Sequence, residues 1–260
     1  MDIDWEYPVA GGLASNITRP EDKQNYTLLV RELRDQLDAA ELTDGREYLL
    51  TIAAAAGYDK IVNYEPAALA AELDWINVMT YDLRGAWDLS ISAHHSPLFP
   101  NPADPASVEI ATRYNCDWAM NEWASAGVPR KQLVMGMPFY GRGWGGVSAT
   151  NNGLFQSATH VPPGTWDDWS TGATGFNEFW EIQLFEQLPE YSKHRDRFSM
   201  VPFLFSPTVE GGHFISYDDE ISIRRKMDYV KSQGFGGAMF WEFSADRNEV
   251  LIDVINDELP

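Results

Sequence analysis

The chain has 260 residues, 44% of them hydrophobic, which is enough to bury the core of one large α/β domain or of two small ones. Its 19 Lys and Arg residues against 39 Asp and Glu residues give a net charge of −20, so it repels phosphate backbones and anionic membranes. No apolar run reaches the roughly 18 residues that a membrane-spanning helix needs. We therefore expect no nucleic acid and no membrane partner, whereas a neutral sugar polymer is not repelled.

The chain opens with Met-Asp-Ile-Asp-Trp-Glu-Tyr-Pro, in which acidic and apolar residues alternate. In a β-strand this pattern places Asp2, Asp4 and Glu6 on one side, with neighbours about 7 Å apart. Ionised carboxylates in such a row repel one another, and this electrostatic cost indicates a functional site.

Three interpretations of this acidic ladder can be compared. An ordinary half-exposed strand would turn the acids toward water. A calcium loop of the EF-hand type needs Gly directly after the third ligand and a Glu further on, whereas Tyr7 and Pro8 follow Glu6 here. The third interpretation is a metal-free acid–base site at the end of a strand that Pro8 terminates.

The remaining predicted elements alternate along the chain. Apolar runs predict strands over residues 48–56, 75–81, 133–140 and 236–243, after a first strand over residues 2–6. Amphipathic stretches predict helices over residues 21–42, 67–73, 107–126 and 219–233, and from about residue 248. Between residues 143 and 216 the alternation fails, and short apolar runs among Gly, Ser and Thr indicate an inserted lobe with antiparallel strands.

Strands that alternate with helices imply a parallel sheet, either a β/α barrel or a doubly wound sheet. No glycine-rich nucleotide-binding motif follows any strand, which favours the barrel. In a barrel the site gathers at the carboxyl ends of the strands. The predicted strands end there in polar or aromatic pairs: Glu6 and Tyr7, Tyr81 and Asp82, Tyr140 and Arg142, and Trp241 and Glu242.

Residues 2–8 resemble the Asp-Gly-x-Asp-x-Asp-x-Glu signature of the family 18 glycoside hydrolases, the chitinases and related endo-N-acetylglucosaminidases. The opening Asp and Gly of that signature would precede Met1, so we expect the chain to begin inside the motif. Four further segments are similar to the same family: residues 79–88, residues 136–144, residues 216–222 with Lys226, and residues 236–242.

The resemblance implies an α/β fold, a (β/α)8 TIM barrel that lacks its first three βα units and carries an α+β insertion between the seventh and eighth strands. Residues 1–142 would supply barrel strands four to seven with their helices, residues 143–217 the inserted lobe, and residues 218–260 the last helix, strand and helix. The family also implies an extracellular protein, although an acidic strand follows Met1 in place of a basic and then apolar leader.

The resemblance further implies retaining hydrolysis of β-1,4 links in chitin or N-acetylglucosamine oligosaccharides. The substrate's own acetamido oxygen would be the nucleophile, with no metal and no cofactor. Glu6 would be the general acid and then the base, Asp4 would orient the acetamido group, and Asp2 would tune Asp4. Tyr81 would hydrogen-bond the acetamido carbonyl. Trp241 would form the floor beneath the sugar and Trp87 a platform on the leaving side, and the other substrate-binding residues would be Tyr7, Met79, Asp82, Tyr140 and Arg142.

Other functions fit the same motifs. An endo-β-N-acetylglucosaminidase would act on glycoprotein glycans, and a chitin-binding, lectin-like protein or an inactive fragment would not catalyse. Lectin-like members usually replace the catalytic Glu, whereas Glu6 is present here. Away from the motifs, His94 and His95 lack metal-ligand spacing and are interpreted as loop residues, and Trp118 and Trp123 as helix core.

Overall fold

A parallel sheet forms the centre of the molecule. The computed structural model describes residues 1–167, 170 and 172–258. Five strands pair in parallel in the order β1-β2-β3-β4-β10, with the strands at the positions predicted from the sequence but shorter at their ends. They are β1 (Asp2–Asp4), β2 (Thr51–Ala55), β3 (Trp75–Met79), β4 (Leu133–Pro138) and β10 (Gly237–Trp241).

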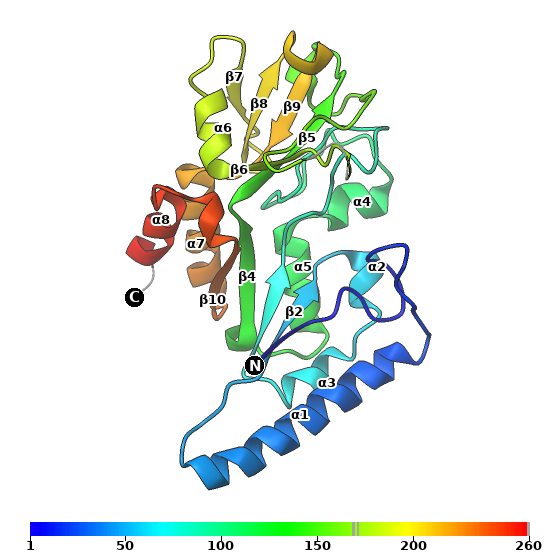
Figure 1. Cartoon of the computed structure of the whole chain (residues 1–260), viewed down its shortest axis with the longest axis vertical. Helices are drawn as coiled ribbons and strands as arrows, with labels where there is room; N and C mark the ends of the chain where they lie inside the picture. Colours follow the sequence, from blue (N-terminus) through cyan, green and yellow to red (C-terminus); the bar gives the residue numbers. More distant parts are fainter. Residues whose placement is uncertain (168–169, 171, 259–260) are drawn as a thin grey trace.

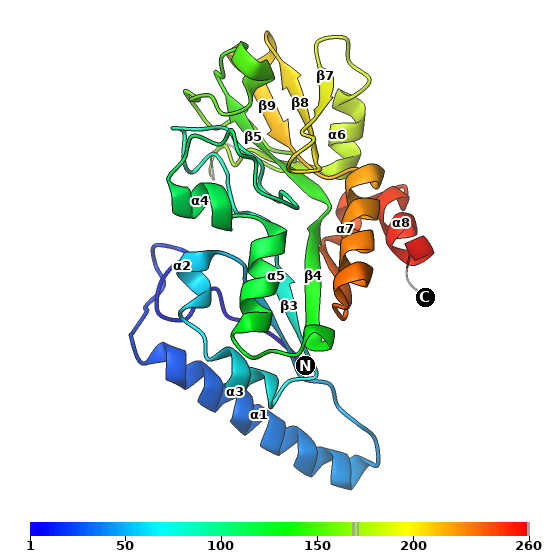
Figure 2. The same ribbon diagram turned by 180° about the vertical axis from the view of Figure 1, so that it is seen from behind.

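Helices connect and cover the strands, as Figures 1 and 2 show. Helix α5 packs against β4, and helix α7 packs against β10. Trp123 of α5 is fully buried, which confirms it as a core residue, and Trp118 is half-buried and packs against the core. The helices are α1 (Asp22–Asp44), α2 (Tyr58–Ile61), α3 (Pro66–Ala70), α4 (Val108–Arg113), α5 (Cys116–Ser125), α7 (Glu220–Gln233) and α8 (Val250–Glu258), with 3-10 turns η1 (Arg130–Gln132), η2 (Thr150–Gly153), η3 (Val209–Gly211) and η4 (Phe243–Ala245).

The single helix predicted over residues 107–126 is two helices. Asn115 is extended, with φ −153°, and its side chain accepts a hydrogen bond from the backbone N–H of Trp118 at 2.9 Å. That side chain therefore caps a new helix, α5, and separates it from α4. An asparagine side chain can interrupt a helix in this way because its amide oxygen accepts a backbone N–H in place of a backbone carbonyl.

A second sheet forms the inserted lobe, which Figure 1 shows beyond the upper end of β4. Its five antiparallel strands follow the order β6-β5-β9-β8-β7. The strand predicted over residues 133–140 ends early, at Pro138, and a new strand begins at Tyr140. Tyr140 and Arg142 therefore belong to the lobe sheet. The lobe consists of β5 (Tyr140–Gly145), β6 (Phe176–Glu178), α6 (Phe179–Phe185), β7 (Ser192–Arg195), β8 (Pro202–Ser206) and β9 (His213–Ser216).

The parallel sheet is the β/α-barrel sheet of the predicted fold, and it is open in the described part of the chain. β1 and β10 are its two edges and do not pair with each other. A closed barrel of this type has eight strands and hydrogen-bonds its first strand to its last. Over the same described residues, none of the helices is long and apolar enough to cross a bilayer.

Candidate active site

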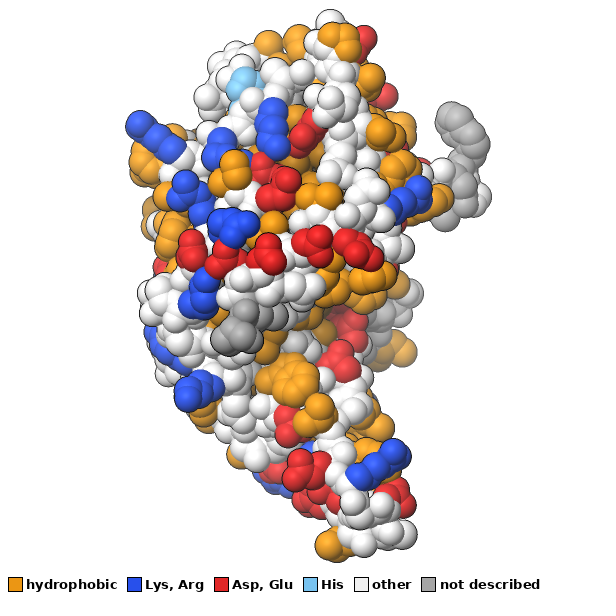
Figure 3. All heavy atoms as spheres, turned by 90° about the vertical axis from the view of Figure 1, so that its left-hand side faces the viewer, with side chains coloured by type: hydrophobic (Ala, Val, Ile, Leu, Met, Phe, Trp, Pro, Cys, Tyr) orange, Lys and Arg blue, Asp and Glu red, His pale blue; other side chains and the backbone are white. Residues whose placement is uncertain are grey.

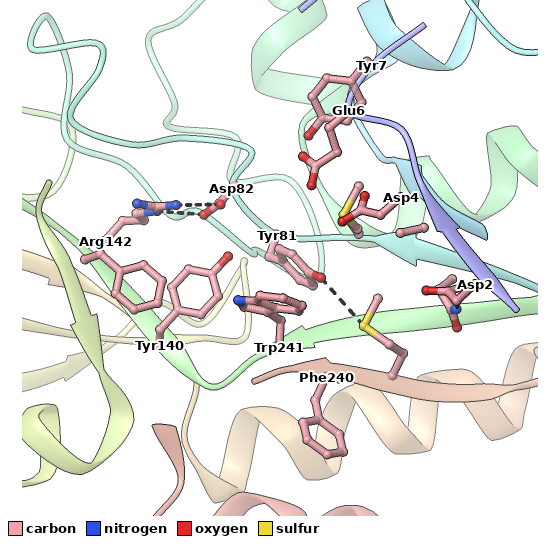
Figure 4. Close-up of a pocket in the computed structure, with 15 residues that line it drawn as sticks. Asp2, Asp4, Glu6, Tyr7, Tyr81, Asp82, Tyr140, Arg142, Phe240 and Trp241 are labelled. Carbon is pink, nitrogen blue, oxygen red and sulfur yellow. Dashed lines mark hydrogen bonds and ion pairs between the residues drawn. The ribbon is translucent and has the colours of Figure 1, made fainter. Parts of the chain in front are cut away.

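A pocket of 410 Å³ opens at the carboxyl ends of the parallel strands. Figure 4 shows the side chains that surround it. It brings together all of the predicted site residues except Trp87: Asp2, Asp4, Glu6, Tyr7, Met79, Tyr81, Asp82, Tyr140, Arg142 and Trp241. Trp87 lines an adjoining hollow of 770 Å³ that shares Glu6, Asp82 and Arg142 with the first. The two hollows are therefore parts of one cleft.

The acidic ladder keeps the alternation that its sequence predicts. Asp2, Asp4 and Glu6 are exposed to the cleft, whereas the residues between them are half-buried. Strand β1 ends at Asp4, so Glu6 projects from the loop just beyond the strand. At the base of the ladder, Asp2 Oδ1 accepts hydrogen bonds from the Thr51 hydroxyl and from Asn77 Nδ2, which anchor it to β2 and β3.

Asp4 is the carboxyl of the ladder whose pKa the site raises. Partial burial in the cleft, the negative charge of Glu6, a hydrogen bond shared with Glu6 and the charge of Asp2 raise its pKa from 3.8 to about 6. Each of these causes disfavours the charged form. Asp4 therefore holds a proton more readily than an ordinary aspartate does.

Tyr81, just after β3, contributes a hydroxyl that stays protonated. Its O–H donates to Met239 Sδ at 3.7 Å, and its ring meets that of Tyr140 edge-on at 6.0 Å between centroids. Burial, with the nearby carboxylates of Asp82 and Glu6, raises the pKa of Tyr81 above its usual value. The hydroxyl therefore remains a hydrogen-bond donor at neutral pH.

Asp82 and Arg142 join the barrel end to the lobe. Arg142 Nε and a terminal nitrogen donate to the two Asp82 oxygens at 2.8 Å and 2.6 Å. Burial opposes ionisation of Asp82, but the hydrogen bonds from Arg142, with His95 close by, outweigh it and hold the pKa of the carboxyl well below its usual range. Asp82 has φ 54°, a left-handed conformation that turns its side chain toward this partner.

Two indoles present open faces to the cleft. Trp241 ends β10 and is 55% exposed, and Trp87 is 62% exposed in the loop after β3. Figure 4 shows Trp241 beneath Tyr81, on the side of the cavity away from Glu6. The guanidinium of Arg142 lies 5.4 Å from the centroid of the Trp87 ring. Exposed aromatic faces flanking carboxylates suit a ligand with flat apolar surfaces and polar edges.

The sequence interpretation missed several residues of this site. His95, interpreted as a loop residue, is fully buried with Nδ1 3.6 Å from Asp82 Oδ1. Asn77, a polar residue inside the apolar strand β3, and Met239 both line the pocket, in alternation with Met79 and Trp241 on their own strands. Because every second side chain of a strand faces the same side, the sequence could have predicted that both residues face the pocket.

Phe176 comes from the lobe and had no such signal. It lies beneath Arg142 and stacks on Tyr140 at 4.3 Å between ring centroids. Only the folding of the lobe over the sheet brings it to the pocket. Among the residues whose positions are described, no group of three or more His, Cys, Asp or Glu is arranged to hold a metal ion.

An open β/α-barrel sheet with a carboxylate ladder and exposed indoles at its carboxyl ends defines a barrel protein with an acidic cleft. The family model of the glycosyl hydrolases family 18 matches residues 1–246. The chain therefore belongs to family 18 of the glycosyl hydrolases.

Relatives named as chitinases are similar over nearly the whole chain. It is 45% identical to Chitinase A1 of Niallia circulans and 31% identical to Chitinase B of Serratia marcescens, covering 100% and 98% of this chain. The structure superposes on chitinase ChiA74 from Bacillus thuringiensis with a TM-score of 0.92 and 39% identity over 99% of this chain and 43% of that one. The chain spans 36% of Chitinase A1 and 56% of Chitinase B.

Proposed function

We propose that the protein hydrolyses β-1,4 links between N-acetylglucosamine units in chitin or its oligosaccharides, and that it acts outside the cell, where such polymers lie. The observation that carries this proposal is the row of Asp2, Asp4 and Glu6 exposed to a cleft that also exposes Trp241. The chitinase relatives support it. A solved structure with a TM-score of 0.85, an N-acetylglucosaminidase from Paenibacillus barengoltzii, supports the same sugar class.

In the proposed mechanism Glu6 protonates the glycosidic oxygen while the acetamido oxygen of the same sugar attacks the anomeric carbon. The bond to the leaving sugar breaks as the bond to the acetamido oxygen forms, giving a cyclic oxazolinium ion. Asp4 accepts the acetamido N–H and stabilises the positive charge, with Asp2 behind it. Water then adds to the anomeric carbon, gives its proton to Glu6, and restores the acetamide.

The remaining side chains hold the sugar in place. Tyr81 would donate its hydroxyl proton to the acetamido carbonyl, which orients that oxygen toward the anomeric carbon. Trp241 would lie beneath the reacting ring and Trp87 beneath the leaving sugar. Asp82, fixed by Arg142, would accept hydrogen bonds from sugar hydroxyls. We assign these roles because each of these side chains lines the cleft.

Replacing the proposed acid tests the mechanism most directly. In the full-length natural protein, Glu6→Gln should retain binding of N-acetylglucosamine oligomers, because the amide has the same shape, but lose about 10²-fold or more in kcat, because it cannot give up a proton. Binding is measured by calorimetry and turnover by product release. Glu32→Gln, an equal charge change on the outer face of α1, is the matched control.

A Glu6→Gln protein that kept more than about a tenth of its kcat would show that Glu6 is not the acid. The stereochemistry of hydrolysis is measured by proton NMR of the first products that the Glu32→Gln control protein releases. Two displacements at one carbon retain the β configuration. First products in the α configuration would contradict acetamido participation, and activity confined to glycoprotein glycans would favour an endo-β-N-acetylglucosaminidase.

A further inference from the structure

Trp166 and Trp180 of the lobe are not among the residues that line the cleft hollows described above. Trp166 precedes β6 and is 67% exposed, and Trp180 lies in the first turn of α6. Their ring centroids are 6.5 Å apart with the planes inclined at 57°. The ring of Trp166 is therefore open to a ligand, and the proposed mechanism uses neither ring.

One buried carboxylate fixes both rings. Glu178 is 4% exposed; one of its oxygens accepts the indole N–H of Trp166 at 2.7 Å, and the other accepts the indole N–H of Trp180. The guanidinium of Arg247 stacks on Trp180, with Cζ 3.8 Å from the ring centroid, and lies 5.8 Å from the centroid of Trp166. Because both indole donors are already satisfied, Trp166 presents a rigid apolar face.

This cluster of Trp166, Trp180, Glu178 and Arg247 continues a wall of the cleft. In the antiparallel pair of β5 and β6, Tyr140 lies opposite Glu178 and Arg142 lies opposite Phe176. Directly opposite residues of such a pair project from the same face of the sheet. Glu178 therefore shares its face with three residues that line the 410 Å³ pocket.

Backbone hydrogen bonds also fix the cluster next to the floor of the cleft. The Phe139 N–H donates to the Trp241 carbonyl at 2.8 Å, and the Phe179 N–H, between Glu178 and Trp180, donates to the Phe139 carbonyl at 3.0 Å. On the other side, the Thr165 N–H donates to the Phe176 carbonyl at 2.8 Å. Two backbone hydrogen bonds thus connect Trp241 to the start of α6, so the cluster lies beside the lobe side of the cleft.

We propose that Trp166 is a further sugar-binding platform, supported by Trp180 and Arg247, for an N-acetylglucosamine chain that extends past Trp241 along the lobe. This inference rests on the proposed function. The open indole face matches the apolar face of a pyranose ring, and the guanidinium N–H groups of Arg247 can donate to hydroxyl or acetamido oxygens at the edge of the ring. Only oligomers long enough to reach the lobe would use the platform.

The test measures binding without turnover, in the full-length natural protein carrying Glu6→Gln. Calorimetry compares the N-acetylglucosamine hexamer with the dimer. Adding Trp166→Ala should weaken hexamer binding about fivefold or more and leave dimer binding unchanged. Trp166→Phe, which keeps a flat ring, should retain most of the hexamer affinity. Phe198→Ala is the matched control, because it removes a 40% exposed aromatic ring between β7 and β8, at the opposite edge of the lobe sheet from β6.

Equal hexamer affinity with and without Trp166→Ala would overturn the platform while leaving the proposed function intact. Equal losses for hexamer and dimer would also overturn it, because they would indicate a general disturbance of the site. If the protein with Glu6 intact hydrolyses no oligomer and the Glu6→Gln protein binds none, the proposed function fails and the platform with it. Should Trp166→Ala not fold, Trp166→Leu keeps apolar bulk without a flat ring, and the same loss is expected.

Discussion

Asp4 stands between two other carboxylates, and its protonation is central to the proposed chemistry. Crowding in the cleft, followed by the charge and hydrogen bond of Glu6 and the charge of Asp2, raises its pKa to about 6. Compared with the unfolded chain, the folded chain thus favours the protonated form of Asp4. The contribution of this group to the free energy of unfolding is therefore present below its ordinary pKa of 3.8 and is lost as the pH rises through about 6.

Removing the charge of Glu6 should lower the pKa of Asp4. In the Glu6→Gln protein the repulsion from that neighbour disappears, whereas the burial of Asp4 and the charge of Asp2 remain, so the pKa should fall from about 6 but stay above 3.8. Carbon NMR of protein labelled at the Asp carboxyl carbons measures this titration. Glu32→Gln should leave it unchanged. An Asp4 titration that is the same in both variants would show that the two carboxyls are not coupled.

Helix α7 carries a buried ion pair between Lys226 and Asp218, the residue just before its N-cap. Lys226 Nζ donates to Asp218 Oδ2 and to Ser96 Oγ, both at 2.6 Å, and the Lys226 and Asp218 side chains are fully buried. The hydrogen bond to Ser96 reaches the segment that carries His95, which in turn lies against Asp82. The pair therefore links the packing of α7 to the position of a cleft residue.

Breaking this pair should destabilise the full-length protein strongly. Lys226→Met leaves Asp218 buried without its cation, and such a loss typically costs about 3–5 kcal/mol. Lys231→Met, on the same helix, removes a solvent-exposed ion pair with Glu258 and should cost far less, because water screens such a pair. Urea unfolding measures both. Similar losses in the two variants would contradict the role given to the Lys226 pair, and Asp218→Asn added to Lys226→Met should recover part of its stability.

At the scale of the whole molecule, the parallel sheet of the described residues has two unpaired edges, β1 and β10. Unpaired N–H and C=O groups on such edges are templates for association with other chains. Figure 3 shows one face of the molecule, where hydrophobic side chains lie among acidic and basic ones. The net charge of −20 slows association but supplies no strand to pair with.

Expressed alone, the 260-residue chain is therefore expected to self-associate and to have little turnover. Three βα units from a family 18 relative, fused ahead of Met1, should pair with both edges and give a monomer with restored activity. Sedimentation velocity and oligomer hydrolysis measure the two properties. An unrelated soluble domain fused at the same place is the control and should change neither. A monomeric, active 260-residue chain would contradict this expectation.

Much of the fold and part of the site could be predicted from local sequence. The alternation of Asp2, Asp4 and Glu6, the alternation of strands with helices, and the polar residues at strand ends all placed a cleft at one edge of a parallel sheet. These patterns are local because strand period and helix period are properties of adjacent residues. The catalytic roles assigned to these residues remain predictions.

Contacts between distant segments could not be predicted in the same way. Arg142 reaches Asp82 because the chain leaves β4 after Pro138 and starts the lobe strand β5. The apolar run over residues 133–140 predicts one continuous strand and gives no sign of this break. His95 and Phe176 enter the site, and Trp166 joins Trp180 on one carboxylate, through the packing of the lobe. Composition and periodicity thus established the sheet and its acidic end. The partners of each side chain depend instead on how the lobe and the loops fold over that sheet, because these contacts join residues that are far apart in the chain.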